Sequence, residues 1–423
     1  MNVVLINQYF PPDGAPTGLM LERVAAELVD QGHAVTILCA KGGYAGGEEG
    51  DAEGRRSRED SGSQASATRS PTILRVGTTG FGRRTFFGKV ADYAFFYLGV
   101  ARHLAFMKPK PDRIVALTTP PYLSILARFF SKMRGGDHAH WVMDLYPDVM
   151  VAHGMLKPKG TPVRFLNSLA RWGFGGKRSK IVLTLGPDME ERTAKHLSPD
   201  VPRAWVPLWG TAENPEGNHP RDPAASGRAA QEASEKEPED KKIVLMYSGN
   251  MGLGHRFGEF LAVAAKAGPQ FQWKFHGQGK RRIEVERFLK GNPDAPVTLG
   301  DYVPRAELTA HLAAADVHLA SLDPVWDGTM VPSKLQGIFA IGRPVIFVGS
   351  EGCAMAKWIN ESGGGWVVPP GDLPALENAL HEALSFPKRE VKGRNARDYG
   401  EHHFQAKNNA QKVATYFARA CSQ

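Results

Sequence analysis

Cysteine is scarce in this chain of 423 residues. The three cysteines, Cys39, Cys353 and Cys421, lie far apart and are odd in number. Their spacing excludes a disulfide scaffold and fits a reducing compartment. Long apolar runs are missing as well, because no uninterrupted stretch reaches the ~18–20 residues of a membrane span. The first residues show no basic region and no small-residue cleavage site, so we expect a cytoplasmic protein without a secretory signal.

Two segments contain almost no large apolar residues. Residues 45–70 and 212–242 are rich in small and charged residues, and they cannot bury enough surface to offset the entropy of ordering. We therefore expect a mobile insert at 45–70 and a low-complexity linker at 212–242. The two segments carry net charges of −2 and −3, whereas the whole chain carries +8, so the remainder stands at +13. The part expected to fold is basic.

Acidic residues are absent between positions 149 and 187, a stretch that holds seven lysines and arginines. Residues 83–110 place aromatic side chains among further cations. This pattern fits an interfacial helix on an anionic membrane, or a groove for an anionic lipid-linked substrate. It equally fits core-facing helices with a solvated basic side. The hypothesis to test is a peripheral inner-membrane contact through residues 83–110 and 157–180, without nucleic-acid binding, since no nucleic-acid-binding signature accompanies the charge.

Short apolar runs alternate with helical periods in both halves of the chain. The runs lie at 3–6, 34–38, 73–76, 114–117, 140–143 and 181–184, and then at 243–247, 272–275, 297–299, 317–319, 344–348 and 365–368. Such alternation predicts an α/β fold with parallel sheets covered on both faces. We expect an N-terminal Rossmann-like domain over 1–211 and a C-terminal one over 243–400, facing each other across a central cleft. An amphipathic helix near 404–420, within 401–423, could pack across the joint.

Two glycine-rich turns follow predicted strands of the second half. In the first turn, the glycines would let backbone N–H groups approach an anion, and His255 and Arg256 could add side-chain donors. The spacing matches neither a P-loop nor a complete dinucleotide fingerprint, so a tight strand-to-helix turn remains an alternative. The second turn combines two glycines with three cations, and a solvent-facing helix start is the alternative there. The candidate residues of these turns are Gly249, Asn250, His255, Arg256, Gly277 and Gly279.

The segment 327–349, which begins at Asp327, contains the sharpest signal. Ser333 suits a helix start with free backbone N–H groups behind it. Lys334 would lie in the first turn, where a cation opposes the helix dipole unless an anion is bound there. A bound diphosphate would satisfy the N–H groups and Lys334 together, so we interpret this segment as an anion site.

The first half offers two candidates. Gly14 lies in the loop after the first strand and would allow close approach of a ligand. Asp144 follows the run at 140–143 and could hold a sugar hydroxyl or act as a base. No His, Cys and carboxylate cluster has metal-ligand spacing, and no nucleophile elbow or catalytic Cys–His signature is present, so we expect no metal and no cofactor.

The ordered segments resemble glycosyltransferase family 4. The matching pieces are VVLINQYFPPDGAPTG, DLYPD at 144–148, LMYSGNMGLGH, LGDYVPRAEL at 299–308, ADVHLASLD at 315–323 and VPSKLQGIFAIGRPVIF. More narrowly, the chain is similar to bacterial transferases of colanic-acid, capsule or O-antigen assembly. The resemblance implies a GT-B fold, in which two Rossmann-like domains face each other. It also implies that a hexosyl or N-acetylhexosaminyl group moves from a nucleoside-diphosphate sugar, with UDP favoured, to a lipid-linked or glycan hydroxyl. Such transfer usually retains the anomeric configuration.

The resemblance also implies residue roles. The N-terminal domain would bind the acceptor and the C-terminal domain the donor. The diphosphate would face Gly249, His255, Arg256, Ser333, Lys334 and Leu335, the base would lie near Tyr302 and Val303, Gly14 would reach the donor phosphate, and Asp144 would lie near the reacting sugar. Asn250, Gly277, Gly279 and Asp327 complete the candidate donor-binding set.

One departure concerns two glutamates that many family members carry eight positions apart. Thr329 and Gly337 occupy those positions here, so both carboxylates are missing. Two other functions therefore stay open. One is an epimerase of nucleoside-diphosphate sugars on the same fold, and the other is a non-catalytic nucleotide-sugar-binding scaffold of a polysaccharide complex.

Overall fold

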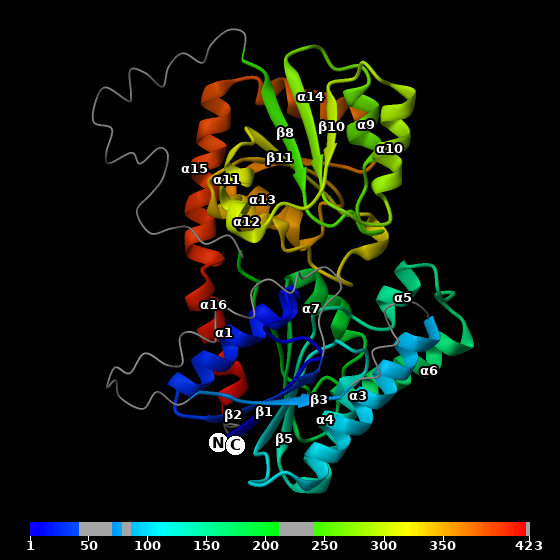
Figure 1. The fold of residues 1–423 in the computed structure, drawn as a ribbon, viewed down its shortest axis with the longest axis vertical. Coiled ribbons are helices and arrows are strands. Elements are labelled where there is room, and N and C mark those ends of the chain that lie inside the picture. The colour runs from blue at the N-terminus through cyan, green and yellow to red at the C-terminus, as the bar shows by residue number, and fades with distance from the viewer. Residues whose placement is uncertain (42–69, 78–85, 211–240, 420–423) are drawn as a thin grey trace. The chain divides into compact units, whose positions relative to one another are not determined.

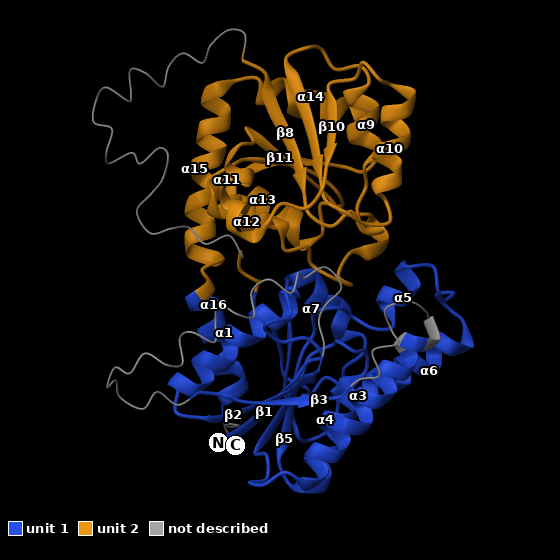
Figure 2. Ribbon diagram, viewed as in Figure 1, with its two compact units in different colours: residues 1–206, 407–423 blue, residues 207–406 orange. Residues whose placement is uncertain are grey.

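The computed structural model describes residues 1–41, 70–77, 86–210 and 241–419. Nearly all of the expected mobile insert at 45–70 and of the linker at 212–242 lies outside these ranges, as do residues 83–85 of the basic segment 83–110. The described residues form two compact units (Figure 2). Unit 1 comprises Met1–Val206 with Lys407–Gln423, and unit 2 comprises Pro207–Ala406.

Unit 1 is built on a seven-stranded sheet, counted over the described residues, in the order β3-β2-β1-β4-β5-β6-β7 (Figure 1). All of its strand pairs are parallel. The strands are β1 (Asn2–Ile6), β2 (Ala34–Ala40), β3 (Thr72–Val76), β4 (Arg113–Ala116), β5 (Asp137–Trp141), β6 (Ser179–Thr184) and β7 (Arg203–Trp205). The helices are α1 (Pro16–Asp30), α3 (Phe86–Phe106), α4 (Leu123–Arg134), α5 (Asp148–Ala152), α6 (Thr161–Phe174), α7 (Pro187–Ala194) and α16 (Ala406–Ala418).

Unit 2 has a six-stranded parallel sheet among its described residues, in the order β10-β9-β8-β11-β12-β13. The strands are β8 (Ile243–Ser248), β9 (Phe271–His276), β10 (Val297–Gly300), β11 (Val317–Ser321), β12 (Val345–Val348) and β13 (Gly365–Val368). The helical segments are α9 (Gly258–Ala264), α10 (Arg282–Gly291), η3 (Arg305–Glu307), α11 (Leu308–Ala313), η4 (Pro324–Trp326), α12 (Lys334–Ala340), α13 (Ala354–Ser362), α14 (Leu373–Ala383) and α15 (Phe386–His403). Two parallel sheets confirm the predicted α/β class.

The strand β5 differs from its expected position. The sequence predicted a run at 140–143, but the strand spans Asp137–Trp141. The strand begins earlier because His138, like His140 within the predicted run, is buried as a neutral ring. His138 bonds the Ser131 hydroxyl at 2.9 Å and the Gly175 carbonyl at 3.2 Å, and burial lowers its pKa to about 4. A histidine-rich stretch that reads as polar thus lies inside the sheet.

The C-terminal helix is shorter than the expected 404–420 and belongs to unit 1. Arg113 fixes its end, since the guanidinium is only 2% exposed and donates to the carbonyls of Phe417 and, at 2.8 Å, Arg419. Arg113 also lies 3.6 Å from the Asp137 carboxylate. The Trp141 and Phe417 rings pack edge to face with centroids 6.1 Å apart. A buried cation on β4 therefore ties the last helix to the first sheet. Packing across a joint stays a prediction.

Arg113→Ala should destabilise unit 1, because two helix-end carbonyls and a carboxylate lose a buried partner. The expected loss of unfolding free energy is about 2–4 kcal/mol. Urea unfolding measures it, with Arg23→Ala on the exposed side of α1 as the matched control. Equal urea midpoints for the two variants would contradict the role of Arg113 in holding the end of α16.

Candidate functional site

The glycine turns of unit 2 pack directly against each other. Gly249 donates its N–H to the His276 carbonyl at 2.9 Å, and the Met251 N–H donates to the Gln278 carbonyl at 2.8 Å. A Cβ at Gly277 would lie 2.0 Å from the Gly249 carbonyl oxygen, and one at Gly279 would lie 2.4 Å from that of Met251. Both glycines also have positive φ, at 135° and 144°. The two loops after β8 and β9 can meet only because these positions lack side chains.

Lys334 reaches into this loop pair from the start of α12. Its ammonium donates to the Tyr247 hydroxyl, to the Asn250 carbonyl at 3.0 Å and to His255 Nε2 at 3.2 Å. It also lies 4.0 Å from the centre of the Tyr247 ring. Among the described residues no carboxylate pairs with Lys334. The three donors are used, but the positive charge is uncompensated.

Desolvation lowers the pKa of Lys334 well below its ordinary value. An anion that enters the site would reverse this effect, because an opposite charge favours the protonated amine. Gly249 leaves the passage that the side chain needs, since a Cβ there would lie 2.8 Å from Lys334 Cε. The site therefore holds a cation poised for an anionic ligand.

His255 supports Lys334 and is not an exposed donor. The ring is 6% exposed, and its Nδ1 bonds the Ser321 carbonyl at 2.8 Å. Burial and the neighbouring Lys334 lower the pKa of His255 to about 3, so the ring is neutral. With the proton on Nδ1, Nε2 is free to accept from Lys334. The sequence suggested direct phosphate contact, whereas the structure shows both ring nitrogens used within the protein.

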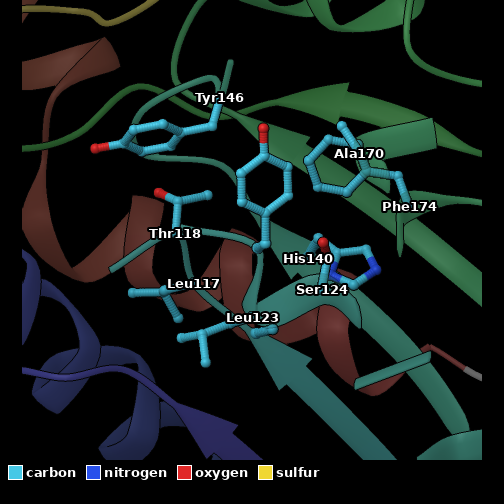
Figure 3. A pocket seen from close by; sticks show the side chains of 10 residues that line it. Leu117, Thr118, Leu123, Ser124, His140, Tyr146, Ala170 and Phe174 are labelled. Carbon is cyan, nitrogen blue, oxygen red and sulfur yellow. The ribbon is translucent and has the colours of Figure 1, made fainter. Parts of the chain in front are cut away.

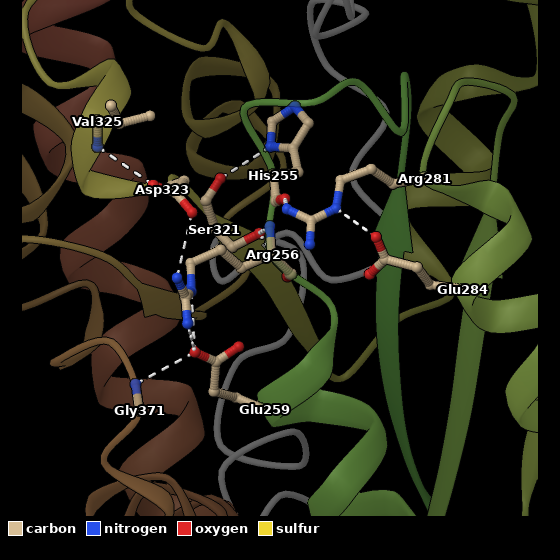
Figure 4. Close-up of polar contacts among 9 residues, drawn as sticks. All are labelled: His255, Arg256, Glu259, Arg281, Glu284, Ser321, Asp323, Val325 and Gly371. Carbon is tan, nitrogen blue, oxygen red and sulfur yellow. Dashed lines mark hydrogen bonds and ion pairs between the residues drawn. The ribbon is translucent and has the colours of Figure 1, made fainter. Parts of the chain in front are cut away.

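Arg256 is held by carboxylates (Figure 4). Its guanidinium donates through Nε to Glu259 at 2.8 Å and through Nη1 to Asp323 at 3.2 Å. Glu259 also accepts the Gly371 N–H at 3.1 Å, and the Ser321 hydroxyl bonds the Arg256 backbone. Two carboxylates compensate one guanidinium, so this cluster fixes the loop and does not present a free cation.

The remaining donor candidates differ in accessibility. Tyr302 is 55% exposed, and its hydroxyl donates to the Gln278 carbonyl at 3.3 Å, whereas Val303 is half-buried. Ser333 is exposed and caps α12 without a side-chain hydrogen bond. Leu335 is fully buried, so only its backbone could meet a ligand. Asp327 is half-buried at the end of η4.

The two positions that lack the family glutamates are also resolved. Thr329 is fully buried and donates its hydroxyl to the Trp326 carbonyl at 2.7 Å. A Cβ at Gly337 would meet only Leu312 Cδ1, at 3.7 Å. Thr329 serves the turn before α12 and does not substitute for a ligand-binding carboxylate.

Asp144 lies in unit 1 at the carboxyl end of the sheet. Its N–H and that of Met143 both donate to the Thr118 hydroxyl at 3.1 Å, which joins the loops after β4 and β5. The Asp144 carboxylate has no hydrogen bond or ion pair to a residue that the structure describes. Burial raises its pKa to about 6. Gly14, by contrast, is exposed, and a Cβ there would meet nothing within 4 Å.

A pocket adjoins the Asp144 loop within unit 1 (Figure 3). Thr118, Tyr122, His140, Tyr146 and Phe174 are among its lining residues. Tyr122 adopts a left-handed φ of 67°, which is uncommon for an aromatic residue and often marks a functional position. Its ring lies 6.5 Å from that of Tyr146. No sequence motif marks Tyr122, so this pair of aromatic rings could not be predicted from the sequence.

Tyr247 and Thr118 were also missed. Tyr247 reads as an ordinary strand residue at the end of β8, yet its hydroxyl accepts from Lys334 and donates to the Asn250 carbonyl at 2.7 Å. Thr118 reads as part of a loop. The available signal was only position, since both residues stand at carboxyl ends of parallel strands.

Over the described ranges, no three His, Cys, Asp or Glu side chains group as metal ligands.

Gly249→Ala should destabilise unit 2, because the new Cβ meets Lys334 and the φ of 123° disfavours a side chain. We expect a loss of about 1–3 kcal/mol in chemical unfolding. Gly258→Ala is the control, since a Cβ at that position meets nothing within 4 Å. If both variants unfold alike, the close packing of Lys334 on Gly249 is wrong.

Known proteins of similar sequence are glycosyltransferases. No protein-family model matches the chain. The probable glycosyltransferase WbjE of Pseudomonas aeruginosa is 26% identical over 64% of this chain and 66% of its own length. The putative colanic acid biosynthesis glycosyl transferase WcaI of Escherichia coli is 26% identical over 92% of this chain and 91% of its own.

Solved structures share the fold over nearly the whole chain. WaaG, a glycosyltransferase involved in lipopolysaccharide biosynthesis, is 18% identical with a TM-score of 0.64, covering 99% of this chain and 100% of its own. Anabaena Alr3699/HepE, solved in complex with UDP-glucose, is 13% identical with a TM-score of 0.64, and 98% of each chain is covered. The chain thus has the two-domain GT-B fold, and it resembles bacterial glycosyltransferases of polysaccharide biosynthesis.

Proposed function

We propose that the protein transfers a hexosyl or N-acetylhexosaminyl group from a nucleoside-diphosphate sugar, with UDP as the favoured carrier. The acceptor is the hydroxyl of a lipid-linked or glycan substrate in surface polysaccharide biosynthesis, and the anomeric configuration is retained. The relatives support glycosyltransferase activity, and a structural neighbour solved with UDP-glucose supports the donor class. The proposal needs neither metal nor cofactor, and it assigns the donor to unit 2 and the acceptor to unit 1.

The observation that carries the proposal is the uncompensated charge of Lys334. When a glycosyl bond breaks, negative charge grows on the departing diphosphate. A fixed cation beside that group stabilises the transition state more than the ground state. Because three neutral acceptors hold the ammonium, a phosphate oxygen would replace one of them without breaking an ion pair. Lys334 is the proposed diphosphate ligand, and His255 and Tyr247 orient it.

Asp144 supplies the second function in this proposal. Its desolvated carboxylate can accept the proton of the acceptor hydroxyl, or stabilise positive charge on the donor sugar. A pKa of about 6 leaves it ionised at neutral pH yet basic enough to take up a proton. Thr118 fixes the backbone of Asp144, so the carboxylate stands on a loop held by two strands.

The proposal includes a position at the membrane. No helix in the described ranges is long and apolar enough to cross a bilayer. We propose a peripheral position on the cytoplasmic face, where a lipid-linked acceptor would be available.

Transfer can be separated from the two alternatives by one assay. The protein is incubated with a radiolabelled UDP-sugar and bacterial membrane lipid extract. Label in the lipid fraction supports transfer, and the anomeric configuration of the product tests retention. A chemically altered nucleotide sugar without lipid label would indicate an epimerase. Binding without turnover would indicate a scaffold.

Lys334→Met should weaken UDP binding by about 10- to 100-fold, since a charge-assisted contact is worth roughly 1.5–3 kcal/mol. Isothermal titration calorimetry with UDP measures both affinities. Lys280→Met removes an exposed cation of the neighbouring loop and is the control. Unchanged UDP affinity in Lys334→Met would remove the diphosphate assignment.

Asp144→Asn should reduce turnover by roughly 100-fold or more and leave UDP affinity unchanged. It should also stabilise the protein at high pH. Because the folded-state pKa of about 6 exceeds the ordinary value near 4, the carboxyl group favours folding at low pH, and this contribution is lost as pH rises through 6.

The variant should therefore be about 2–3 kcal/mol more stable than the wild type at pH 8 and equal to it near pH 4. Unfolding curves at the two pH values, measured beside turnover, test both effects. Wild-type turnover in Asp144→Asn would exclude the proposed chemistry, and no stability gain at pH 8 would exclude the buried, unpaired carboxylate.

A further inference from the structure

Exposed apolar side chains concentrate on one part of unit 1. Of the sixteen large hydrophobic residues that are exposed among the described ones, nine lie between positions 90 and 172. They are Val90, Phe95, Leu98, Phe106, Phe129, Met133, Met155, Phe165 and Trp172. Eight of these belong to α3, α4 and α6. In a protein that buries its other large residues efficiently, such a concentration marks an interaction surface.

The helix α3 is apolar on two sides. Phe96, Val100 and Leu104 are fully buried in the core of unit 1. Phe95, Leu98 and Phe106 are 54%, 68% and 74% exposed, at spacings that place them on the opposite side of the same helix. The inner residues account for the folding of α3, but they do not account for the outer ones.

The helices α4 and α6 extend this surface. α4 lies beside both α3 and α6 (Figure 1). Phe129 and Met133 project from α4 with the exposed Lys132 between them, and Phe165 and Trp172 project from α6. The Arg128 guanidinium lies 4.6 Å from the Trp172 ring centre and donates to the Trp172 carbonyl, so it joins α4 to α6. The three helices present one continuous outer face, which we call the α3–α4–α6 face.

The charged side chains of these three helices are basic with one exception. α4 and α6 contain no acidic residue, and α3 contains one, Asp92. Arg102, Lys132, Arg164 and Arg171 are exposed among the apolar side chains. Aromatic and aliphatic groups that insert between lipid tails, surrounded by cations that meet phosphate headgroups, are the chemistry of an anionic bilayer surface. A protein partner would need an acidic and apolar complement of the same breadth.

We infer that the α3–α4–α6 face docks unit 1 onto an anionic membrane, with α4 at its centre. The choice of a bilayer over a protein partner rests on the proposed function, because a lipid-linked acceptor is embedded in a membrane. α4 begins at Leu123, directly after Tyr122, which lines the pocket beside the Asp144 loop. A docked α4 would thus lead from the lipid surface toward the acceptor side of unit 1. The sequence suggested contact through 83–110 and 157–180; the structure adds α4 between them.

Vesicle co-sedimentation tests the docking with the full-length protein. The wild type should bind vesicles that contain phosphatidylglycerol, bind pure phosphatidylcholine vesicles far more weakly, and lose binding at high salt. The triple variant Phe95→Ser, Leu98→Ser, Phe106→Ser should reduce binding at least tenfold. All three side chains point to solvent, so the variant should fold. Ile283→Ser with Val391→Ser, which removes comparably exposed residues of unit 2, should bind like the wild type.

A charge variant supplies the second arm. Lys132→Gln with Arg164→Gln should reduce binding to anionic vesicles by about 10-fold or more at low salt. The inference would be overturned if the wild-type protein does not bind anionic vesicles. It would also be overturned if the unit 2 control loses as much vesicle binding as the triple variant. A second copy would cover the face instead if the wild type does not bind vesicles, is a dimer in light scattering, and becomes a monomer in the triple variant.

Docking and catalysis can fail separately. The triple variant should keep its UDP affinity and its transfer to a detergent-soluble acceptor, and should lose transfer only to acceptor in vesicles. Lys334→Met should keep vesicle binding. If the wild type binds vesicles but transfers no sugar, the docking stands and the proposed function fails. If transfer to vesicle-borne acceptor survives in the triple variant, the docking fails and the proposed function stands.

Discussion

An ammonium group held without a carboxylate is the constraint on which the site of unit 2 depends. Lys334 donates only to a hydroxyl, a carbonyl and a neutral imidazole. Two of these acceptors are fixed by the fold, since Tyr247 lies on the central strand β8 and His255 bonds the Ser321 carbonyl. Partial desolvation of a cation costs stability in the free protein, and a bound anion recovers it. The arrangement of the loops therefore favours the anion-bound state over the free one.

The nearby arginines show how selectively that charge is left open. Arg256 is compensated by Glu259 and Asp323, and Arg281 by Glu284. These pairs hold the loops that surround Lys334, whose own charge has no carboxylate partner among the described residues.

The sequence predicted the α/β class and most strands, because buried parallel strands appear as continuous apolar runs. It failed at β5, where neutral histidines occupy the core, and it did not separate α4 and α6 from their surroundings. For the site it predicts roles for Lys334, Gly249 and Asp144 from residue type and position, and these roles stay predictions. It could not predict partners, since Tyr247 lies 87 residues from Lys334 and only the fold brings them together. The sequence likewise predicts phosphate contacts for His255 and Arg256, whose side chains bond within the protein in the structure.

The two proposed functional groups share one physical property and differ in sign. Lys334 in unit 2 is a desolvated cation without an anionic partner, and Asp144 in unit 1 is a desolvated carboxylate without a cationic one, each judged over the described residues. Asp148, by contrast, has partners, since Arg192 and His196 both contact its carboxylate. Leaving opposite charges open in separate units reduces the stability of each unit alone. A bound diphosphate would compensate Lys334, and an acceptor hydroxyl could give its proton to Asp144, so each unit by itself offers the group that one of the two proposed substrates needs.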